Sequence, residues 1–447
     1  MNQPGKNKID VPLLVFKSVL IILVFLAGGW FAKKNWQPFK FIDEAFEATV
    51  TVVEEQTQVR PVLLVESRYS GDGVYLYDEA QAYNGLTVLQ GTMPGGPQLR
   101  LIDMQGREIH RWDVDFFKIW PNPEHLPEKQ RPKSKFNYHT QGMVVFPDGS
   151  VLVNVSGKGT AKLDKCGKVE WTVDHMTHHS ITPIDGGGYW IPAHRPAQDV
   201  PEHLIFAGIT RDKLLNAPPG QLYQYENLVL RVDEGGRIIK SFSVLQALYE
   251  AGLESAIDST MYIKPDDPTH LNDIEIVTEA LAAKIDGVGV GDLLLSLRQM
   301  KMLVILDDET GALKWHYIGP WIYQHDPDIT AEGNIVVFNN ANYWLHFNRK
   351  PGSNLVELDP ATGRTHIIYP LGDQPAFVSE LLGAHELLPN GNRLIVESRA
   401  GRVFEITPNG DIVWDFIKPY DDTYASLIAY AERVDVDFFE VDDWQCE

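Results

Sequence analysis

One phrase of sequence returns six times in this chain and strongly limits what it can fold into. Each copy has an apolar strand, an Asp or an equivalent residue, a short turn with glycine, and a second strand that often ends on an aromatic residue. Asp at a strand end and Gly directly after it suit a tight hairpin turn. The copies are LRLIDMQGREIHRW, AKLDKCGKVEW, LRVDEGGRIIKSF, VILDDETGALKW, VELDPATGRTHIIY and FEITPNGDIVW, with turn glycines Gly106, Gly167, Gly236, Gly311, Gly363 and Gly410.

The spacing of these hairpins indicates the fold. Successive turn glycines lie 47 to 75 residues apart, which leaves room for four strands in each repeat. Six such units predict an all-β fold, a six-bladed β-propeller in which the aromatic residue of one hairpin packs on the neighbouring blade. A two-sheet sandwich would have a similar strand content but would not explain the repetition. The stretch 243–256, SVLQALYEAGLESA, is expected to form a short helix on the rim of one blade.

Composition and charge narrow the class of protein. The chain has 447 residues, of which 44% are hydrophobic and 11% aromatic, as in a packed globular protein. Its formal net charge of -22 argues against a nucleic-acid partner and against electrostatic docking on anionic lipid. It does not exclude an anionic substrate, because a local pocket can be positive. A homo-oligomer is left open.

The N-terminal segment differs from the rest of the chain. Residues 11–32 are apolar except for Lys17 and are long enough to span a bilayer. We expect an uncleaved signal anchor; the alternative is a cleaved signal peptide, but no clear A-x-A site follows. Basic residues on both sides leave the orientation open. The expected organisation is a membrane anchor with flanks (1–40), lead-in strands and the start of the first blade (41–100), a propeller catalytic domain (101–420) and an acidic tail closing on the propeller (421–447).

The chain has two cysteines, Cys166 and Cys446. In an oxidising compartment they could pair and tie the C-terminus to the body of the protein. In the cytosol they would be two free thiols. Their spacing matches no metal or redox motif.

Histidines recur at one place in the repeat. Five segments expected to form the innermost strand of a blade open with histidine, in a chain that has only 14 histidines. Innermost strands line the central channel of a propeller, so these side chains would converge on one opening. The alternative is that they are turn residues bonded to neighbouring backbone, repeated because the blade was duplicated. The residues are His139, His178 with His179, His270, His325 and His385.

An arginine follows one of these inner segments. Arg298 lies between two apolar strands in LLLSLRQMKMLVILD. Burying a guanidinium group without an anionic partner is costly. Arg298 therefore either pairs with an acidic neighbour or reaches into the pocket to hold an oxyanion.

The order of these segments resembles that of the bacterial arylsulfate sulfotransferases, which do not use PAPS and have a six-bladed propeller. The resemblance covers roughly residues 100 to 420 and is carried by HHSI, HLND, SLR and QHDPDITAEGNIVVFNN. It implies that His325 is the nucleophile that carries the sulfuryl group. It also implies catalytic roles for His270, Arg298, and His178 or His179, of which we favour His178, and a substrate-binding role for Asn272. We add His139 and His385 as substrate-binding candidates.

The resemblance also implies a reaction. A sulfuryl group would pass from an aryl sulfate donor to His325 and then to a phenolic acceptor, in a ping-pong mechanism. We expect no cofactor and no metal, and the chain has no Gly-rich phosphate loop for a nucleotide donor. With the anchor, it implies a single-pass inner-membrane protein whose propeller lies in the periplasm.

Two other functions are compatible with a propeller. A membrane-tethered propeller can bind a partner or assemble a complex without catalysis, since fold alone does not decide function. A quinone-cofactor dehydrogenase would usually have eight blades and an acidic calcium site, and neither is visible in the sequence. Side chains of His270, Arg298 and His325 gathered at one point would favour the enzyme, and scattered ones would favour the scaffold.

Overall fold

The computed structural model describes residues 60–206, 208–216, 226–264, 266–341 and 352–446, together with Val19 and Leu23. From residue 60 onward, these residues belong to one compact unit, residues 59–447. Their strands form six antiparallel sheets, each of which is one blade of a propeller. The prediction of an all-β six-bladed β-propeller is confirmed.

Blades one to three follow one another in the chain order of their middle strands, and each runs from its innermost strand outward. Blade one holds β25 (Leu427–Val434), β2 (Leu86–Met93), β3 (Gly96–Ile102) and β4 (Glu108–Asp113). Blade two holds β5 (Thr140–Val145), β6 (Val151–Val155), β7 (Gly159–Leu163) and β8 (Val169–Val173). Blade three holds β9 (Thr182–Pro183), β10 (Tyr189–His194), β11 (Asn227–Val232) and β12 (Ile238–Ser243).

The other three blades follow the same order, and the last one has a fifth strand. Blade four holds β13 (Leu271–Ile276), β14 (Leu293–Leu297), β15 (Met302–Leu306) and β16 (Leu313–Ile318). Blade five holds β17 (His325–Ile329), β18 (Ile335–Asn339), β19 (Asn354–Asp359) and β20 (Arg364–Tyr369). Blade six holds β21 (Ala384–Leu387), β22 (Arg393–Glu397), β23 (Arg402–Ile406), β24 (Ile412–Ile417) and β1 (Gly73–Tyr77).

The repeated phrase forms the two outer strands of each blade, from β3–β4 to β23–β24. All six turn glycines have φ between 67° and 84°, a left-handed conformation that glycine adopts without steric cost. The terminal aromatic residues contact the next blade: a Cβ added at Gly236 would lie 2.5 Å from the ring of Trp171, and one at Gly311 would lie 2.5 Å from Phe242. The repeat therefore fixes both the hairpin and the contact between blades.

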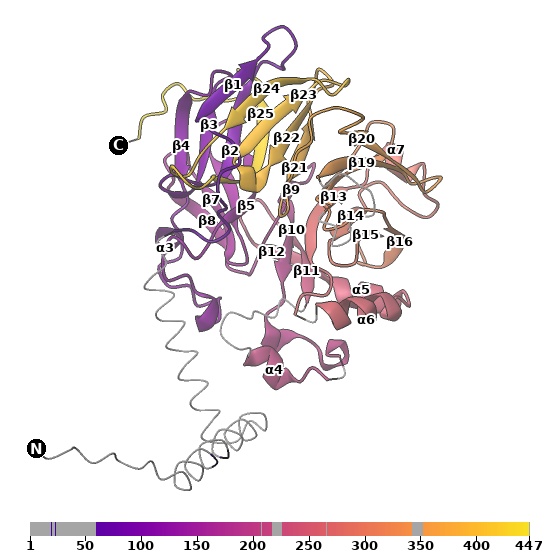
Figure 1. Ribbon diagram of the computed structural model, residues 1–447. Helices are drawn as coiled ribbons and strands as arrows, with labels where there is room; N and C mark the ends of the chain where they lie inside the picture. Colours follow the sequence, from indigo (N-terminus) through magenta and orange to yellow (C-terminus); the bar gives the residue numbers. More distant parts are fainter. Residues whose placement is uncertain are drawn as a thin grey trace, which may run out of the picture. The chain divides into compact units, whose positions relative to one another are not determined.

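Strands from the two ends of the described chain close the ring. The C-terminal β25 is the inner strand of the blade that holds β2, and β1 pairs with β24 at the outer edge of blade six (Figure 1). Blade strands thus lie on both sides of the range 101–420. Strand β1 lies in the last blade, although the sequence around residues 73–92 was expected to belong to the first.

Within the described residues, five short α-helices lie between strands: α3 (Phe116–Ile119), α4 (Arg211–Leu215), α5 (Val244–Glu250), α6 (Glu254–Ile263) and α7 (Glu279–Ala282). The prediction of a single helix over 243–256 is wrong, because this stretch forms two helices, α5 and the start of α6. The Ser243 hydroxyl caps α5 by accepting from the Gln246 N–H at 3.0 Å. Gly252, with φ of 74°, separates the two helices.

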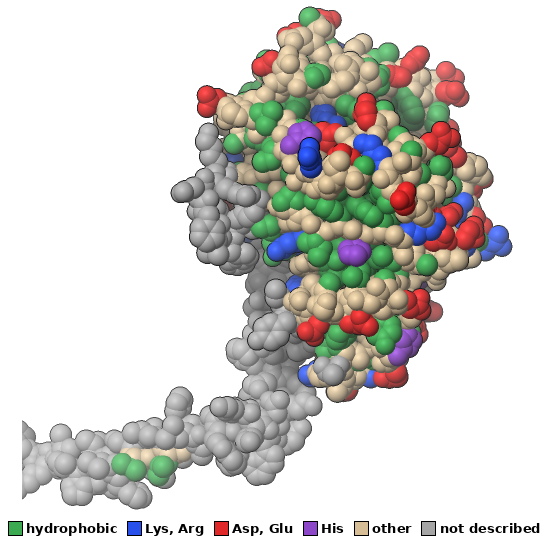
Figure 2. Space-filling view, turned by 90° about the vertical axis from the view of Figure 1, so that its right-hand side faces the viewer, with side chains coloured by type: hydrophobic (Ala, Val, Ile, Leu, Met, Phe, Trp, Pro, Cys, Tyr) green, Lys and Arg blue, Asp and Glu red, His purple; other side chains and the backbone are tan. Residues whose placement is uncertain are grey.

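The structure also bears on the predicted membrane span, on the two cysteines and on the surface charge. No helix among the described residues is both long and apolar enough to cross a membrane. The span predicted at residues 11–32 lies outside the described residues except for Val19 and Leu23. A disulfide joins Cys166 and Cys446 across 280 residues of sequence. On the face shown in Figure 2, Asp and Glu side chains are spread around the periphery, in keeping with the formal net charge of -22.

Candidate active site

A cavity of about 420 Å³ lies where the inner strands of the six blades meet. Imidazole and amide side chains, among them His179, Asn272 and His325, line what we call its imidazole half, and the carboxylates Asp273, Glu275, Asp326, Asp328 and Glu432 line what we call its carboxylate half. All six blades contribute to the wall, through Gln141, His179, Asn272, His325, Ala384 and Tyr430 among others. The fold therefore does bring side chains distant in sequence to one place.

Irregular backbone marks the start of three inner strands. The pairing register shifts between Thr140 and Met143 in β5, between Leu271 and Asp273 in β13, and between His325 and Pro327 in β17. In a regular strand, neighbouring side chains point to opposite faces. The β17 irregularity allows the neighbours His325 and Asp326 both to line the cavity.

Left-handed backbone conformations occur at the same place. His179, His270, Tyr323 and Asp326 have φ between 48° and 57°. Non-glycine residues adopt this conformation at a cost of about 1 to 2 kcal/mol each, and it persists only where surrounding structure enforces it. Such strain gathers at functional sites, so it supports a binding or catalytic role for the cavity.

His325 is held through one ring nitrogen. Its Nδ1 lies 2.7 Å from Oδ1 of Asn340 and 3.0 Å from the backbone oxygen of Tyr323. The Asn340 amide group donates to the backbone oxygens of Ser379 (2.7 Å) and Leu382 (2.5 Å), which turns its oxygen toward His325. Both neighbours of Nδ1 are acceptors, so Nδ1 carries the proton and Nε2 keeps its lone pair. Nε2 is buried and has no partner within the described ranges.

Arg298 supplies positive charge beside His325. Its guanidinium carbon lies 4.3 Å from the centre of the Tyr323 ring, a cation–π contact. Its side chain forms no salt bridge with the residues that the structure describes, and its buried Nε has no partner among them. Burial lowers the pKa of Arg298, while Tyr323 and Asp267 oppose that shift. A buried guanidinium without a carboxylate partner is suited to receive an anion.

His270 and Asn272 lie across the strand end from Arg298. The Arg298 N–H donates to the His270 oxygen at 3.0 Å, which joins the two residues through the backbone. The Nδ1 of His270 contacts the Asp267 carboxylate. The Asn272 amide donates to the backbone oxygen of Gln324 at 2.7 Å, and its buried Oδ1 has no partner among the described residues.

His179 lies between the other imidazoles. Its ring centre is 5.3 Å from that of His270 and 6.4 Å from that of His325. His178 lies behind it, with Nδ1 2.8 Å from Nδ1 of His179 and its ring stacked on His194 at 3.9 Å. Of the pair 178/179, therefore, His179 lines the cavity.

Burial keeps these imidazoles neutral. Desolvation, followed by the charge of Arg298, lowers the pKa of His325 to about 3. Desolvation also lowers the pKa of His178 to about 3, with the neighbouring His270 adding to the effect. The pKa of His179 falls well below its usual value for the same first reason, with other histidines adding to it. A neutral imidazole nitrogen is a competent nucleophile.

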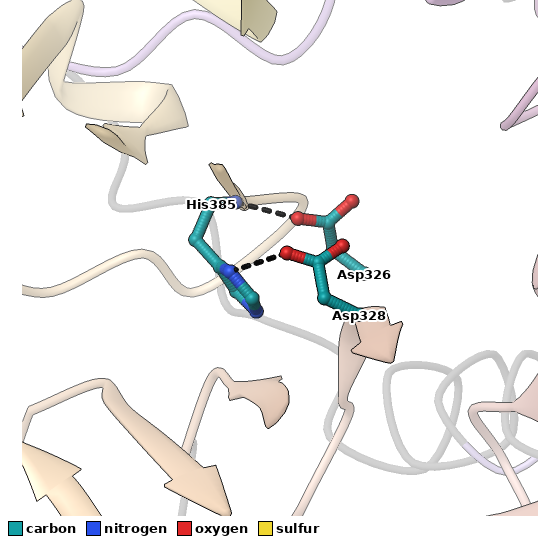
Figure 3. Close-up of side chains that lie close together, drawn as sticks. All are labelled: Asp326, Asp328 and His385. Atoms are coloured by element: carbon teal, nitrogen blue, oxygen red, sulfur yellow. Dashed lines mark hydrogen bonds and ion pairs between the residues drawn. The ribbon is translucent and has the colours of Figure 1, made fainter. Parts of the chain in front are cut away.

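Two of the predicted substrate-binding histidines lie apart from this group. The backbone oxygen of His139 accepts from Ser156, and burial beside the Lys158 charge lowers the pKa of His139 to about 4. His385 contacts two carboxylates: its ring Nδ1 is 2.9 Å from Oδ2 of Asp328, and its backbone N–H donates to Oδ2 of Asp326 at 2.5 Å (Figure 3). The structure thus gathers His178, His179, His270, Asn272, Arg298 and His325, and places His139 and His385 outside that cluster.

Sequence reasoning missed some residues of this site. Asn340 stands at the end of the very stretch that carries His325, but only the pairing of β17 with β18 shows that its side chain reaches the ring. Tyr323 precedes His325 by two residues and gave no signal. Asp267 precedes His270 by three residues, and His194 is the last residue of β10, outside the repeated position.

Comparisons with known proteins identify one family. The family model described as Arylsulfotransferase (ASST) matches residues 142–419. No curated protein matches the chain. A protein of unknown function from Bacteroides caccae is 10% identical with a TM-score of 0.47, covering 77% of this chain and 97% of its own.

Other solved structures resemble the chain more weakly. Virginiamycin B lyase from Staphylococcus aureus is 12% identical with a TM-score of 0.35, covering 66% of this chain and 84% of its own. The Pan2 WD40 domain from Neurospora crassa is 11% identical with a TM-score of 0.39, covering 78% of this chain and 80% of its own. TM-scores below 0.5 support no statement about the function of this chain.

Proposed function

Because the chain belongs to the arylsulfotransferase family, we propose that it moves a sulfuryl group from an aryl sulfate ester to a phenolic acceptor through His325. The observation that carries this proposal is the state of the His325 ring. Its Nδ1 is occupied by Asn340 and Tyr323, while the buried Nε2 is free and lies beside the charge of Arg298. A fixed tautomer with a free Nε2 is what a nucleophilic imidazole requires.

The first half-reaction transfers the sulfuryl group to the protein. The Nε2 lone pair of His325 attacks sulfur, the N–S bond forms, and the S–O bond to the aryl oxygen breaks. The phenoxide leaves with the bonding electron pair and takes the proton held at Nε2 of His270. Since phenoxide is a better leaving group than alkoxide, aryl esters suit this step. The proton on Nδ1 stays on the ring, hydrogen-bonded to Asn340.

The second half-reaction reverses the first with another phenol. The acceptor oxygen attacks sulfur, the new O–S bond forms, and the N–S bond returns its electron pair to Nε2 of His325. The acceptor proton passes to the group that protonated the first phenoxide. His270 is placed for this exchange, because Asp267 holds its Nδ1 and leaves Nε2 for the reacting oxygen. Donor and acceptor occupy the site in turn, so no nucleotide is needed.

Arg298 and the neighbouring donors position the sulfuryl oxygens. Negative charge spreads over these oxygens in a loose transition state, by analogy with phosphoryl transfer. A guanidinium group can bind two of them at once, and in a site shielded from water this interaction is stronger than in bulk solvent. Asn272 and His179 line the same wall and complete the polar surroundings.

We extend the proposal to location. The disulfide between Cys166 and Cys446 supports an oxidising compartment for the propeller. Together with the apolar segment 11–32, this supports a propeller tethered to the inner membrane on its periplasmic side.

Burst kinetics test the reaction. Mixing the protein with 4-nitrophenyl sulfate in the absence of acceptor should release up to one 4-nitrophenol per chain rapidly, and added phenol should restore turnover. His325→Ala should abolish both phases. His366→Ala is the matched control, because that ring is exposed and pairs with Glu357 at the surface. Full turnover in His325→Ala with an unchanged fold would remove His325 as the nucleophile.

A further inference from the structure

Ligand atoms for a cation lie in and beside the carboxylate half of the cavity. One such atom from each of Asp326, Asp328 and His385 lies within 4.8 Å of the other two. Figure 3 shows the His385 ring beside the two carboxylates, with β17 and β21 supplying them from different blades. Both aspartates line the cavity. Three ligand atoms within 4.8 Å of one another are close enough to bind one ion.

Free lone pairs remain after the internal hydrogen bonds are formed. The backbone N–H of His385 donates to Oδ2 of Asp326, and its ring Nδ1 lies 2.9 Å from Oδ2 of Asp328. The Oδ1 of each aspartate has no hydrogen bond among the described residues. The His385 side chain is fully buried, and its Nε2 likewise has no partner within those ranges. Nδ1 is the ring nitrogen that faces the carboxylates: it lies 2.9 Å from Oδ2 of Asp328 and 3.3 Å from Nη1 of Arg393, whose N–H groups can only donate. This places the lone pair on Nδ1, so the imidazole and the Asp328 carboxylate present two acceptor atoms to one point.

Surrounding charge also favours a cation. Asp273, Glu275 and Glu432 line the same cavity, so five carboxyl groups face it. Arg393 is the cation beside His385, and Arg433 is already paired with Glu405 at 3.2 Å. Carboxyl groups this close must either hold protons or share a cation.

From these observations we infer that Asp326, Asp328 and His385 bind a divalent cation in the central channel. The donor set has carboxylate oxygens with one imidazole nitrogen, which fits hard to borderline divalent ions such as Ca²⁺, Mg²⁺, Mn²⁺ or Zn²⁺. Bound there, the ion joins the inner strands of blades five and six. The inference does not rest on sulfuryl transfer, because none of the three ligands belongs to the imidazole cluster around His325.

Calorimetric titration tests the site. The full chain, treated with EDTA and dialysed, is titrated separately with CaCl₂, MgCl₂, MnCl₂ and ZnCl₂. At least one salt should bind with one equivalent, and the same salt should raise the thermal unfolding midpoint. The double variant Asp326→Asn, Asp328→Asn should lose at least about tenfold in affinity. Glu309→Gln, a change at an exposed surface carboxylate, is the control and should bind as the parent does.

Three outcomes decide the inference. Binding lost in the double variant and kept in the control supports it. No heat with any of the four salts and an unchanged unfolding midpoint would overturn it and leave shared protons as the state of these carboxyl groups. Binding of equal strength in the double variant would also overturn it.

If the double variant does not fold, Mn²⁺ electron paramagnetic resonance of the parent and of His385→Gln decides instead: a bound signal without nitrogen coupling in the parent contradicts the site. Burst kinetics of the parent are read separately, so failure here is distinguishable from failure of the proposed function.

Discussion

The two halves of one channel respond oppositely to the same burial. Where the inner strands begin, desolvation lowers the pKa of His325 to about 3 and keeps the ring neutral. Further along the channel, desolvation raises the pKa of Glu432 to about 7 and favours the neutral acid. Water removal thus suppresses charge in both halves. What differs is the charge that a ligand must bring: an anion beside Arg298 in the imidazole half, and a cation in the carboxylate half.

The largest difference between the two halves should appear when one arginine of each is exchanged for lysine. Arg298→Lys should lower kcat by about 10²- to 10³-fold, because a single ammonium group cannot reproduce two parallel N–H donors toward the sulfuryl oxygens. Arg393→Lys is the matched change in the carboxylate half, where Arg393 contacts His385 at 3.3 Å. It should leave kcat with 4-nitrophenyl sulfate within about threefold, because the side-chain contact of Arg393 is with His385 and not with the imidazole cluster around His325. Equal losses in the two variants would show that the halves do not differ in role.

A smaller effect should follow from changing the partner of His325. Asn340→Asp keeps an acceptor at Nδ1 but adds negative charge, which favours the protonated ring and removes the donors to Ser379 and Leu382. We expect kcat to fall by about 10- to 100-fold, in the range for residues that orient a reacting histidine. Since only the neutral ring attacks, the acid limb of the pH–kcat profile should move to higher pH.

Asn339→Asp is the control for this change. The Asn339 side chain accepts from the backbone N–H groups of Ile322 and Ala341 at 2.8 and 3.0 Å and does not contact His325. Its variant should keep the acid limb of the parent. An unmoved limb in Asn340→Asp would mean that Asn340 supports the fold without setting the state of the ring.

The smallest effect should appear in stability as a function of pH. The folded-state pKa of Glu432 is about 7, above its ordinary value of 4.5, so its contribution to stability is present below about pH 4.5 and lost as pH rises through 7. Glu432→Gln should therefore gain about 1 to 3 kcal/mol over the parent at pH 8 and less at pH 5, measured by urea unfolding with EDTA present. For His325 the sign is reversed: its folded pKa lies below 6.5, so stability falls as pH drops from 6.5 toward 3. A gain of the same size at both pH values would contradict burial as the cause.

The sequence predicted the outer part of each blade better than the ring closure. Asp and Gly at fixed positions specify a local turn, as in Asp103 and Gly106, where the Asp103 carboxylate accepts from the Gln105 and Arg107 N–H groups. Local pattern does not say which sheet a terminal strand joins. Strand β1 therefore appeared to begin the first blade, whereas it pairs with β24 across more than 300 residues of sequence.

The residues of the imidazole half could be predicted from sequence, whereas those of the carboxylate half could not. Repetition placed His270 and His325 at equivalent strand starts, so their convergence followed from the fold. No repetition marks Asp326, Asp328 or Glu432. Whether Asp326 faces the channel depends on the register shift after His325, a backbone irregularity that alternation of residues does not reveal.

Locating the sulfuryl group on the chain tests the central claim most directly. The protein is incubated with an aryl sulfate without acceptor, quenched in alkali to protect the N–S bond, digested and mapped by mass spectrometry. The account predicts the added mass of one SO₃ group on the peptide that contains His325, absent in His325→Ala and removed when phenol is added before the quench. An adduct on another residue, or turnover of the ester with no adduct on any peptide, would contradict it.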